Sequence, residues 1–349
     1  MTLSIGNPSR ILIIRLSAIG DLVMASPLVG ALRARLPRAH IAWLVQSESA
    51  ALLEHLPGLD EVIPWPRDAW RDLARQKRYG ALAGEAQRFA RRLREHRFEL
   101  ILDIQGLLKS AVWAWASRAP VRVGLDSREG GSLLMTDVVR SPRGDRRIGS
   151  EYRFLAGQLG LNTDTFTMSL GIADDDRARA GALLREAGVR GDYAVLLPFT
   201  TRPQKHWLEE RWAELARRVR DEMSLAPVVL GGPGDREDAA RIVDSSLAAN
   251  LAGSTTLREA AAVIEGAALA VGVDTGLTHM GIAAGVPTVA LFGSTCPYLD
   301  TGTHRAAVVY HRLPCSPCRR HPTCGGSFDC MRAITPGDVL ATARGLITA

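Results

Sequence analysis

Short apolar runs alternate with amphipathic stretches along the whole chain. In the first half, five runs rich in Ile, Leu and Val have the length of buried strands. They are ILII (11–14), IAWLV (41–45), EVIPW (61–65), ELILDI (99–104) and VRVGL (121–125). Helical patterns such as ALRARL from Ala31 and GEAQRFARRLREH from Gly84 separate several of them. This alternation predicts a parallel sheet whose strands are connected by helices.

The same pattern starts again in the second half. Four further apolar runs are AVLLPF (194–199), PVVLGG (227–232), AALAVGV (267–273) and PTVALFG (287–293). Between the first two of these, apolar residues recur at helical spacing from Leu208 to Val219. We therefore expect two successive doubly wound α/β halves, joined somewhere between about Leu161 and Ala173.

Length and composition agree with two globular domains. The chain has 349 residues, of which 46% are hydrophobic and 23% are charged, and one hydrophobic core rarely serves so many residues. Arg15 interrupts the first apolar run, which reads as a strand and not as a signal peptide. The long uncharged stretch 275–299 is punctuated by Gly276, Gly281, Gly285, Pro287 and Gly293, which argues against a membrane-spanning helix. The sequence predicts a cytoplasmic protein.

The charge pattern favours small anionic partners over nucleic acid. The net charge is +6, with 43 Lys and Arg residues, an excess that suits phosphates or lipid headgroups. The basic residues are interleaved with acids, as in RRLREHRFE (91–99), and no run combines basic and aromatic residues. We therefore expect no nucleic-acid partner.

In doubly wound sheets, ligands bind beyond the carboxyl ends of the strands, so the turns that follow strands are where chemistry is expected. The first such turn is SAIGD (17–21), which has one glycine and not the three of a dinucleotide fingerprint. Taken alone, Asp21 reads as a cap on the next helix.

The turn PFTTRPQKHWLEERW (198–212) offers hydroxyl groups at Thr200 and Thr201 and an ammonium group at Lys205. A helix expected to begin around Trp207 would add its free N–H groups and the positive end of its dipole. These groups suit a phosphate. A polar loop with a solvated lysine is the alternative.

The turn GGPGDRED (231–238) is rich in glycine, which lets the backbone approach a ligand closely. Asp235 could then accept hydrogen bonds from ribose hydroxyls. The alternative is a tight turn in which Asp235 caps the following helix.

The turn GVDTGLTHMGIAAGVP (272–287) ends an apolar strand at Asp274 and starts a helix at Thr275 and Gly276. Backbone N–H groups at that helix terminus can bind a diphosphate. His279 falls one turn into the helix, near the same ligand, a position that capping by Asp274 alone does not explain.

Together these turns resemble glycosyltransferase family 9, the ADP-heptose:lipopolysaccharide heptosyltransferases. The resemblance spans nearly the whole chain, in the expected order. Its segments are RLSAIGDLVMASP (15–27), LDIQGLLKSA (102–111), GLDSREG (124–130), TTRPQKHW (200–207) and VDTGLTHMGIAAGVPTVALFG (273–293). It implies a GT-B fold, in which two Rossmann-like doubly wound domains face a central cleft.

The resemblance also implies the domain roles. Residues 1–165 would form the acceptor-binding domain and 174–334 the ADP-sugar-binding domain, which includes a Cys-rich segment at 315–330. A C-terminal helix over 335–349 could pack back on the N-terminal domain.

The resemblance assigns residue roles for an inverting transfer that needs no catalytic metal. Asp21 would be the general base that deprotonates the acceptor hydroxyl, and Lys205 would stabilise the departing diphosphate. The remaining donor-binding residues would be Thr200, Thr201, Asp235, Asp274, Thr275, Gly276 and His279. The donor would be ADP-heptose carrying L-glycero-D-manno-heptose.

On the acceptor side, DIQGLLKSA and DSRE resemble the first heptosyltransferase more than the second. This implies the Kdo-bearing lipid A core of lipopolysaccharide as acceptor, and peripheral contact with the cytoplasmic face of the inner membrane. Lys109 and Arg128 could contact its carboxylates or phosphates, although each also reads as a solvated surface charge. No membrane anchor is recognisable in the sequence.

Other functions stay open at this point. The second heptosyltransferase activity, or another family 9 transfer, would use the same donor turns with a different acceptor. A nucleotide-sugar epimerase would not need the acceptor-like segments, and a non-catalytic nucleotide-binding protein would have no use for Asp21.

Four of the five cysteines lie close together, at Cys315, Cys318, Cys324 and Cys330, with C-x2-C-x5-C-x5-C spacing. In a reducing compartment such clustering suggests a metal site or reduced thiols more than disulfides. A structural Zn or Fe site and unliganded thiols are both compatible with this spacing.

Overall fold

The computed structural model describes residues 3–127, 129–140, 144–318 and 321–348. The chain divides into two compact units: Met1–Asp145 with Gly149–Gly171, and Arg146–Ile148 with Ile172–Ala349. The main division falls in the interval where the sequence pattern predicts a linker. Within the described ranges, no helix combines the length and apolar character needed to cross a bilayer.

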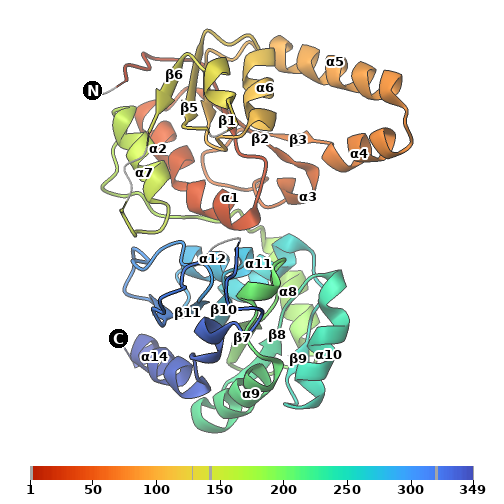
Figure 1. The fold of residues 1–349 in the computed structure, drawn as a ribbon, viewed down its shortest axis with the longest axis vertical. Coiled ribbons are helices and arrows are strands. Elements are labelled where there is room, and N and C mark those ends of the chain that lie inside the picture. Colours follow the sequence, from red (N-terminus) through yellow and green to blue (C-terminus); the bar gives the residue numbers. More distant parts are fainter. Residues whose placement is uncertain (1–2, 128, 141–143, 319–320, 349) are drawn as a thin grey trace. The chain divides into compact units, whose positions relative to one another are not determined.

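A parallel sheet forms the centre of the first unit, and its described strands follow the order β3-β2-β1-β4-β5-β6 (Figure 1). These strands are β1 Arg10–Ile14, β2 His40–Gln46, β3 Glu61–Trp65, β4 Leu100–Asp103, β5 Val121–Leu125 and β6 Asp137–Val139. The five predicted strands are confirmed. The sequence did not predict β6, because three residues beginning with an acid show no recognisable period.

The order of this sheet reverses between β1 and β4, which pair directly and bring Ile14 opposite Asp103. The chain segments that follow these two strands therefore leave the same edge side by side. This is the position at which ligands bind in doubly wound sheets.

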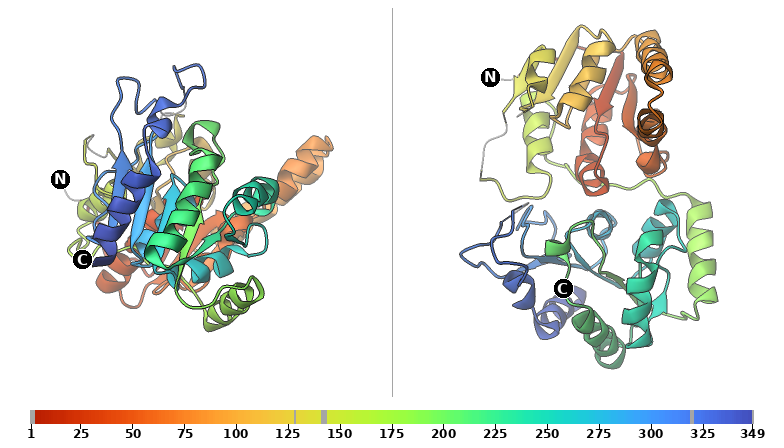
Figure 2. Two further views of the ribbon diagram at one scale, coloured as in Figure 1. Left: turned by 90° about the horizontal axis from the view of Figure 1, so that it is seen from below. Right: turned by 45° about the vertical axis from the view of Figure 1, so that its right-hand side comes forward.

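Helices pack on both faces of the first sheet (Figure 2). They are α1 Ile19–Ala25, α2 Pro27–Arg35, α3 Ser47–Ala50, α4 Arg67–Arg75, α5 Tyr79–Glu95, α6 Leu108–Ala116 and α7 Ser150–Gln158, with a 3-10 turn η1 at Gly131–Leu134. α2 packs against α7, and α5 packs against α6. The inner side of α5 and α6 closes a core with the strands through Phe89, Leu93 and Trp113.

The second unit repeats this topology. Its sheet has the order β12-β11-β10-β7-β8-β9, which matches the first unit when each is counted from its first strand. The strands are β7 Tyr193–Leu197, β8 Ala226–Val229, β9 Ala249–Asn250, β10 Leu269–Val273, β11 Thr288–Phe292 and β12 Ala306–Tyr310. The four predicted strands are confirmed. The two-residue β9 is too short to show a pattern and was not predicted. The edge strand β12 was also not predicted, although its residues AAVVY form an apolar run.

Two groups of helices pack on the second sheet (Figure 1). α9 Glu209–Met223 contacts α10 Arg236–Asp244 and α14 Pro336–Thr348, and α11 Leu257–Glu265 contacts α8 Asp174–Glu186 and α12 Gly276–Ala283. Shorter pieces are α13 Asp329–Arg332 and the 3-10 turns η2 Pro203–Lys205 and η3 Pro233–Asp235. Both sheets therefore have the layered arrangement of the predicted GT-B fold class.

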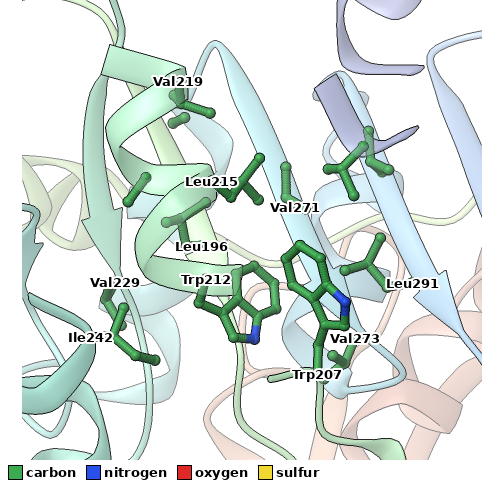
Figure 3. Close-up of a cluster of buried hydrophobic side chains, with 14 of the residues drawn as sticks. Leu196, Trp207, Trp212, Leu215, Val219, Val229, Ile242, Val271, Val273 and Leu291 are labelled. Carbon is green, nitrogen blue, oxygen red and sulfur yellow. The ribbon is translucent and has the colours of Figure 1, made fainter. Parts of the chain in front are cut away.

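The core under α9 contains two tryptophans (Figure 3). Trp207 and Trp212 meet edge to face with ring centroids 5.0 Å apart, and the Trp207 ring nitrogen donates to the Ile334 carbonyl at 3.0 Å. Val339 and Leu340 of α14 are buried in the same core. The apolar face of α14 is thus used within the second unit, and its expected packing on the N-terminal half stays a prediction.

A short segment of the first half of the chain belongs to the second unit. Arg146 accepts hydrogen bonds from the backbone of Leu299 and Asp300, and Ile148 donates to Asp300 at 2.8 Å. The chain then returns to the first unit at Gly149. The sequence pattern gave no signal for this excursion, because it involves isolated backbone pairing and no apolar run.

Gly272 allows α12 to lie close to β10. A Cβ atom at this position would lie 2.1 Å from the Thr278 hydroxyl oxygen and 2.8 Å from the Leu197 Cβ. The Thr278 hydroxyl itself donates to the Val273 carbonyl at 2.7 Å and fixes the start of α12 on the strand end. The glycine therefore helps to position the residues of α12.

We expect Gly272→Ala to destabilise the protein by about 1–3 kcal/mol, because the added methyl group overpacks a closed interface. Urea unfolding would measure the loss. Gly345→Ala is the matched control: this glycine lies in α14 with nothing within 4 Å of an added Cβ, so alanine should raise stability by up to about 1 kcal/mol. Equal stability of Gly272→Ala and the wild type would contradict the packing argument.

Candidate active site

Asp21 lies in the first turn of α1, directly beyond the carboxyl end of β1. Its carboxylate accepts the backbone N–H of Ala18, the residue before the helix, at 3.3 Å. It also forms an ion pair with Arg15, and its side chain remains 31% exposed. Asp21 therefore caps α1, as the sequence suggested, but from the third residue of the helix. Its side chain extends back to the N–H group of the residue before the helix. The exposed part of the carboxylate is accessible to a ligand.

Arg15 fixes this carboxylate in place through the ion pair. The guanidinium is buried, donates to the Ile104 carbonyl at 2.8 Å and lies over the ring of Tyr152 at 5.8 Å. A buried charge needs a partner, and here Asp21 supplies it. The sequence analysis used Arg15 only to exclude a signal peptide. The signal in the sequence was a single charged residue in an otherwise apolar run, because such a charge needs a partner.

Asp103, the last residue of β4, and Gln105, which follows the strand, connect this edge to the turn before Asp21. The Gln105 side-chain oxygen accepts the backbone N–H groups of Leu16 at 2.7 Å and Ser17 at 3.2 Å. Asp103 is buried and accepts bonds from the Gln105 N–H at 3.1 Å and the Ser110 hydroxyl at 3.0 Å. These contacts fix the turn that carries Asp21 to the start of α6.

Of the two expected acceptor contacts, the structure places one. Lys109 is exposed at the start of α6, and partial burial followed by the positive charge of Arg67 lowers its pKa. Two cations therefore lie near each other close to the start of α6. Arg128 lies outside the described residues.

Asp274 is the centre of the corresponding edge in the second unit. Its side chain is 12% exposed and forms an ion pair with the Lys205 ammonium at 2.7 Å. The Thr295 hydroxyl donates to the same carboxylate at 2.5 Å, and His279 Nε2 lies 3.5 Å from its other oxygen. Burial disfavours the charged carboxylate, but the bonds and charges of His279 and Lys205 outweigh it and hold the pKa of Asp274 well below its usual range.

A tyrosine that the sequence analysis did not identify orients His279. The Tyr298 hydroxyl lies 2.8 Å from His279 Nδ1, and both side chains are buried. Burial raises the pKa of Tyr298 well above its usual value, so the phenol keeps its proton. The contact at Nδ1 fixes the ring so that Nε2 faces Asp274.

The other predicted donor residues lie along the same edge, on the turns that follow β7, β8 and β10. The Thr200 hydroxyl donates to the Asp274 carbonyl at 3.4 Å, and Thr201 is exposed beside it. Thr275 stands at the N-cap position of α12 without a capping bond from its side chain, and α12 begins at Gly276 as expected. The helix after Lys205 starts later than predicted, at Glu209, because Pro203–Lys205 forms a separate 3-10 turn.

Asp235 stands at the N-cap position of α10, the alternative that the sequence analysis gave, but its carboxylate makes no bond to α10 and closes the 3-10 turn η3. One carboxylate oxygen accepts the Gly232 N–H at 2.7 Å, and the residue precedes α10. This bond leaves the second oxygen for another partner, so ribose binding by Asp235 stays a prediction.

The four clustered cysteines do not form a metal site in the described structure. Within the described ranges, no group of three or more His, Cys, Asp or Glu side chains is arranged to hold a metal ion. Cys330 is buried on α13 against Gly293, whereas Cys315 is exposed. Burial, followed by the nearby Cys318, Cys315 and Cys324, raises the pKa of the Cys330 thiol. The structure gives no support to the expected Zn or Fe ion.

Comparison with known sequences identifies the family. A sequence profile of glycosyltransferase family 9 (heptosyltransferase) matches residues 86–326. The chain belongs to this family. It is 31% identical to lipopolysaccharide heptosyltransferase 1 of Pseudomonas aeruginosa over 88% of this chain and 86% of that protein. It is 27% identical to the Escherichia coli K12 heptosyltransferase 1 over 84% of this chain and 90% of that protein.

Solved structures of the family have the same fold. The E. coli heptosyltransferase WaaC with ADP-2-deoxy-2-fluoro heptose matches with a TM-score of 0.71 and 25% identity, over 96% of this chain and 99% of that one. The E. coli heptosyltransferase II structure matches with a TM-score of 0.75 and 23% identity, over 97% and 98% of the two chains. The predicted GT-B fold class is confirmed.

The protonation of Asp103 makes the stability of the folded protein depend on pH. Burial, opposed in part by the bond from Ser110, raises the pKa of Asp103 to about 6. Because the unfolded value is about 3.9, the folded protein binds this proton more tightly between about pH 4 and 6. The stability that this group contributes is therefore present below about pH 4 and is lost as pH rises through 6, a total of roughly 3 kcal/mol.

As the pH rises from 4 to 7, the free energy of unfolding of Asp103→Asn should increase by roughly 3 kcal/mol relative to that of the wild type. The reason is that asparagine does not titrate. Urea unfolding at several pH values measures this difference. Asp164→Asn, at an exposed position of the same unit, is the matched control. If the difference between Asp103→Asn and the wild type does not change with pH, Asp103 does not carry the buried proton.

Proposed function

We propose that the protein transfers L-glycero-D-manno-heptose from ADP-heptose to the Kdo–lipid A inner core of lipopolysaccharide. The observation that carries the proposal is the charged edge of the second unit, where Lys205 and the start of α12 meet at Asp274. Lys205 has three N–H donors, and its ammonium group lies 2.7 Å from the Asp274 carboxylate and 3.5 Å from the Asp274 carbonyl oxygen. The ammonium group and the free N–H groups of α12 suit a diphosphate. The E. coli relative with a bound ADP-heptose analogue supports this donor.

In the proposed mechanism, the two units supply complementary chemistry. Asp21 accepts the proton of the acceptor hydroxyl, whose oxygen attacks the anomeric carbon of the heptose with inversion. The bond to the diphosphate breaks, and Lys205 stabilises the negative charge that develops on the ADP product. A protein cation and a helix terminus perform the role that a metal ion has in other transferases, so we propose a transfer that needs no catalytic metal.

Arg15 prepares Asp21 for this role. It ties the carboxylate to the β4 side of the sheet while leaving 31% of the side chain exposed. A fixed carboxylate needs little reorganisation to meet a hydroxyl group. Lys109 and Arg128 would contact acidic groups of the acceptor, and Thr200, Thr201 and Asp235 would contact the donor.

The proposed acceptor is an amphiphile, so we propose peripheral contact with the cytoplasmic face of the inner membrane. A second heptosyltransferase activity is the competing proposal. The E. coli heptosyltransferase 2 is 26% identical over 97% of this chain, whereas the higher identities are to heptosyltransferase 1 proteins. This order favours the first reaction.

The decisive experiment is mass spectrometry of truncated lipopolysaccharide acceptors incubated with the protein and ADP-heptose. We expect one added heptose on the acceptor that carries Kdo but no heptose. Addition only to an acceptor that already carries a heptose would support the competing proposal. ADP release without any acceptor, or no turnover at all, would argue against both.

Two variants test the division of labour. We expect Asp21→Asn to lower kcat by about 10²–10⁴-fold with unchanged ADP-heptose binding, because general base catalysis contributes that range. Lys205→Met should lower kcat and also weaken ADP binding, since it removes a charge that faces the diphosphate. ADP binding by calorimetry and thermal unfolding serve as controls for folding. Near wild-type turnover of Asp21→Asn would show that another group is the base.

The Zn or Fe ion expected at Cys315, Cys318, Cys324 and Cys330 stays a prediction. Elemental analysis of protein purified without chelator tests it directly. We expect about one ion per chain if the cysteines rearrange into a tetrahedral site. A metal-free, fully active protein with four reactive thiols would rule it out.

A further inference from the structure

The outer face of α6 is apolar, although it is exposed. Leu108, Val112 and Trp115 lie three and four residues apart and so share one side of the helix. Their exposed fractions are 45%, 39% and 57%. Lys109 is the polar residue of this helix that is exposed, in contrast to the charged outer face of an ordinary surface helix.

The inner face of α6 already has its own partners. Trp113 is 8% exposed and packs against Phe89 of α5, with ring centroids 5.0 Å apart. Ser110 bonds to Asp103 at the sheet edge. The core of the first unit is therefore complete without the outer side chains.

A further exposed leucine lies on a turn that packs on α6. The turn η1 packs on α6, where the Cβ position of Gly131 lies 3.1 Å from the Ala111 Cβ. Leu133 of η1 is 90% exposed. We call Leu108, Val112, Trp115 and Leu133 the α6 surface.

Cations lie at both ends of α6. Lys109 stands at its start, with Glu129 as the nearby acid. At its end, Arg94 donates to the Ala116 carbonyl at 2.8 Å, Arg122 donates to the Ala119 carbonyl at 2.5 Å, and Arg118 is exposed. Apolar side chains that include a tryptophan, bordered by Lys and Arg, are typical of surfaces that enter the headgroup layer of an anionic membrane.

The α6 surface is continuous with the candidate acceptor edge. α6 begins five residues after Asp103, and the Asp103–Ser110 bond joins the helix to the network that holds Asp21. A helix of this length extends roughly 14 Å from that edge. An amphiphile whose sugar head lies at Asp21 would thus meet an apolar path that leads away from the site.

We propose that the α6 surface docks on an anionic phospholipid bilayer and so presents the acceptor edge to a lipid-borne sugar. This inference rests on the proposed function for its biological purpose. The docking itself is a separate property, because the protein would bind such a membrane in the absence of donor and acceptor.

The test is sedimentation with phosphatidylethanolamine vesicles that contain phosphatidylglycerol and carry neither ADP-heptose nor acceptor. We expect Trp115→Ser and Leu133→Ser each to lower the partition coefficient by about tenfold, since each removes one large apolar side chain from the membrane contact. Leu247→Ser is the matched control. Leu247 is 81% exposed in the second unit, and its replacement should leave partition unchanged.

Fluorescence locates the contact. All seven tryptophans lie in the described residues, and Trp115 alone among them is largely exposed. Brominated lipids should quench the wild type and not Trp115→Phe, which should still bind. Equal losses for Leu133→Ser and Leu247→Ser, or no Trp115 quenching, would overturn the proposal. So would light scattering that shows the α6 surface closing a dimer without vesicle binding. Because no step measures transfer, failure of the proposed reaction would leave these outcomes unaffected.

Discussion

A buried carboxylate must stay paired, and this requirement organises the donor edge of the protein. Lys205 comes from the turn after β7, His279 from α12 and Thr295 from the segment after β11, and all converge on Asp274. Removing any partner would leave charge in a poorly hydrated place, which costs several kcal/mol. The three segments therefore hold one another in position before a ligand arrives. Such preorganisation is what stabilisation of a leaving group requires.

In the first unit a buried charge is also paired, but the signs of the two partners are reversed. There the buried group is the cation, Arg15, and its partner Asp21 is partly exposed. The strand order of both sheets reverses beside their first strands, so each charged pair stands where the topology opens a crevice. Equal topology thus positions the proposed leaving-group site in one unit and the proposed base in the other.

The sequence was sufficient for the features that depend on local pattern. Apolar runs located nine strands, and the turns after them carried Asp21, Lys205 and Asp274. It was insufficient where function depends on packing between distant segments. Tyr298 follows β11 in a stretch without a period, and Asp103 reads as the last residue of a strand. Only the fold shows that one orients His279 and that the other holds the turn of Asp21.

The proposed donor-site and acceptor-site residues differ more in their exposure to solvent than in residue type. Lys205 and Asp274, with side chains 18% and 12% exposed, are fixed in place and suit a donor diphosphate whose charge changes during the reaction. Asp21 is more exposed, which suits the proposed base for a hydroxyl group on a large glycolipid. The apolar side chains on the outer face of α6 are more exposed still and would face the lipid. A glycolipid acceptor needs a polar reaction centre beside an apolar surface, and the first unit provides both through the residues around Asp103.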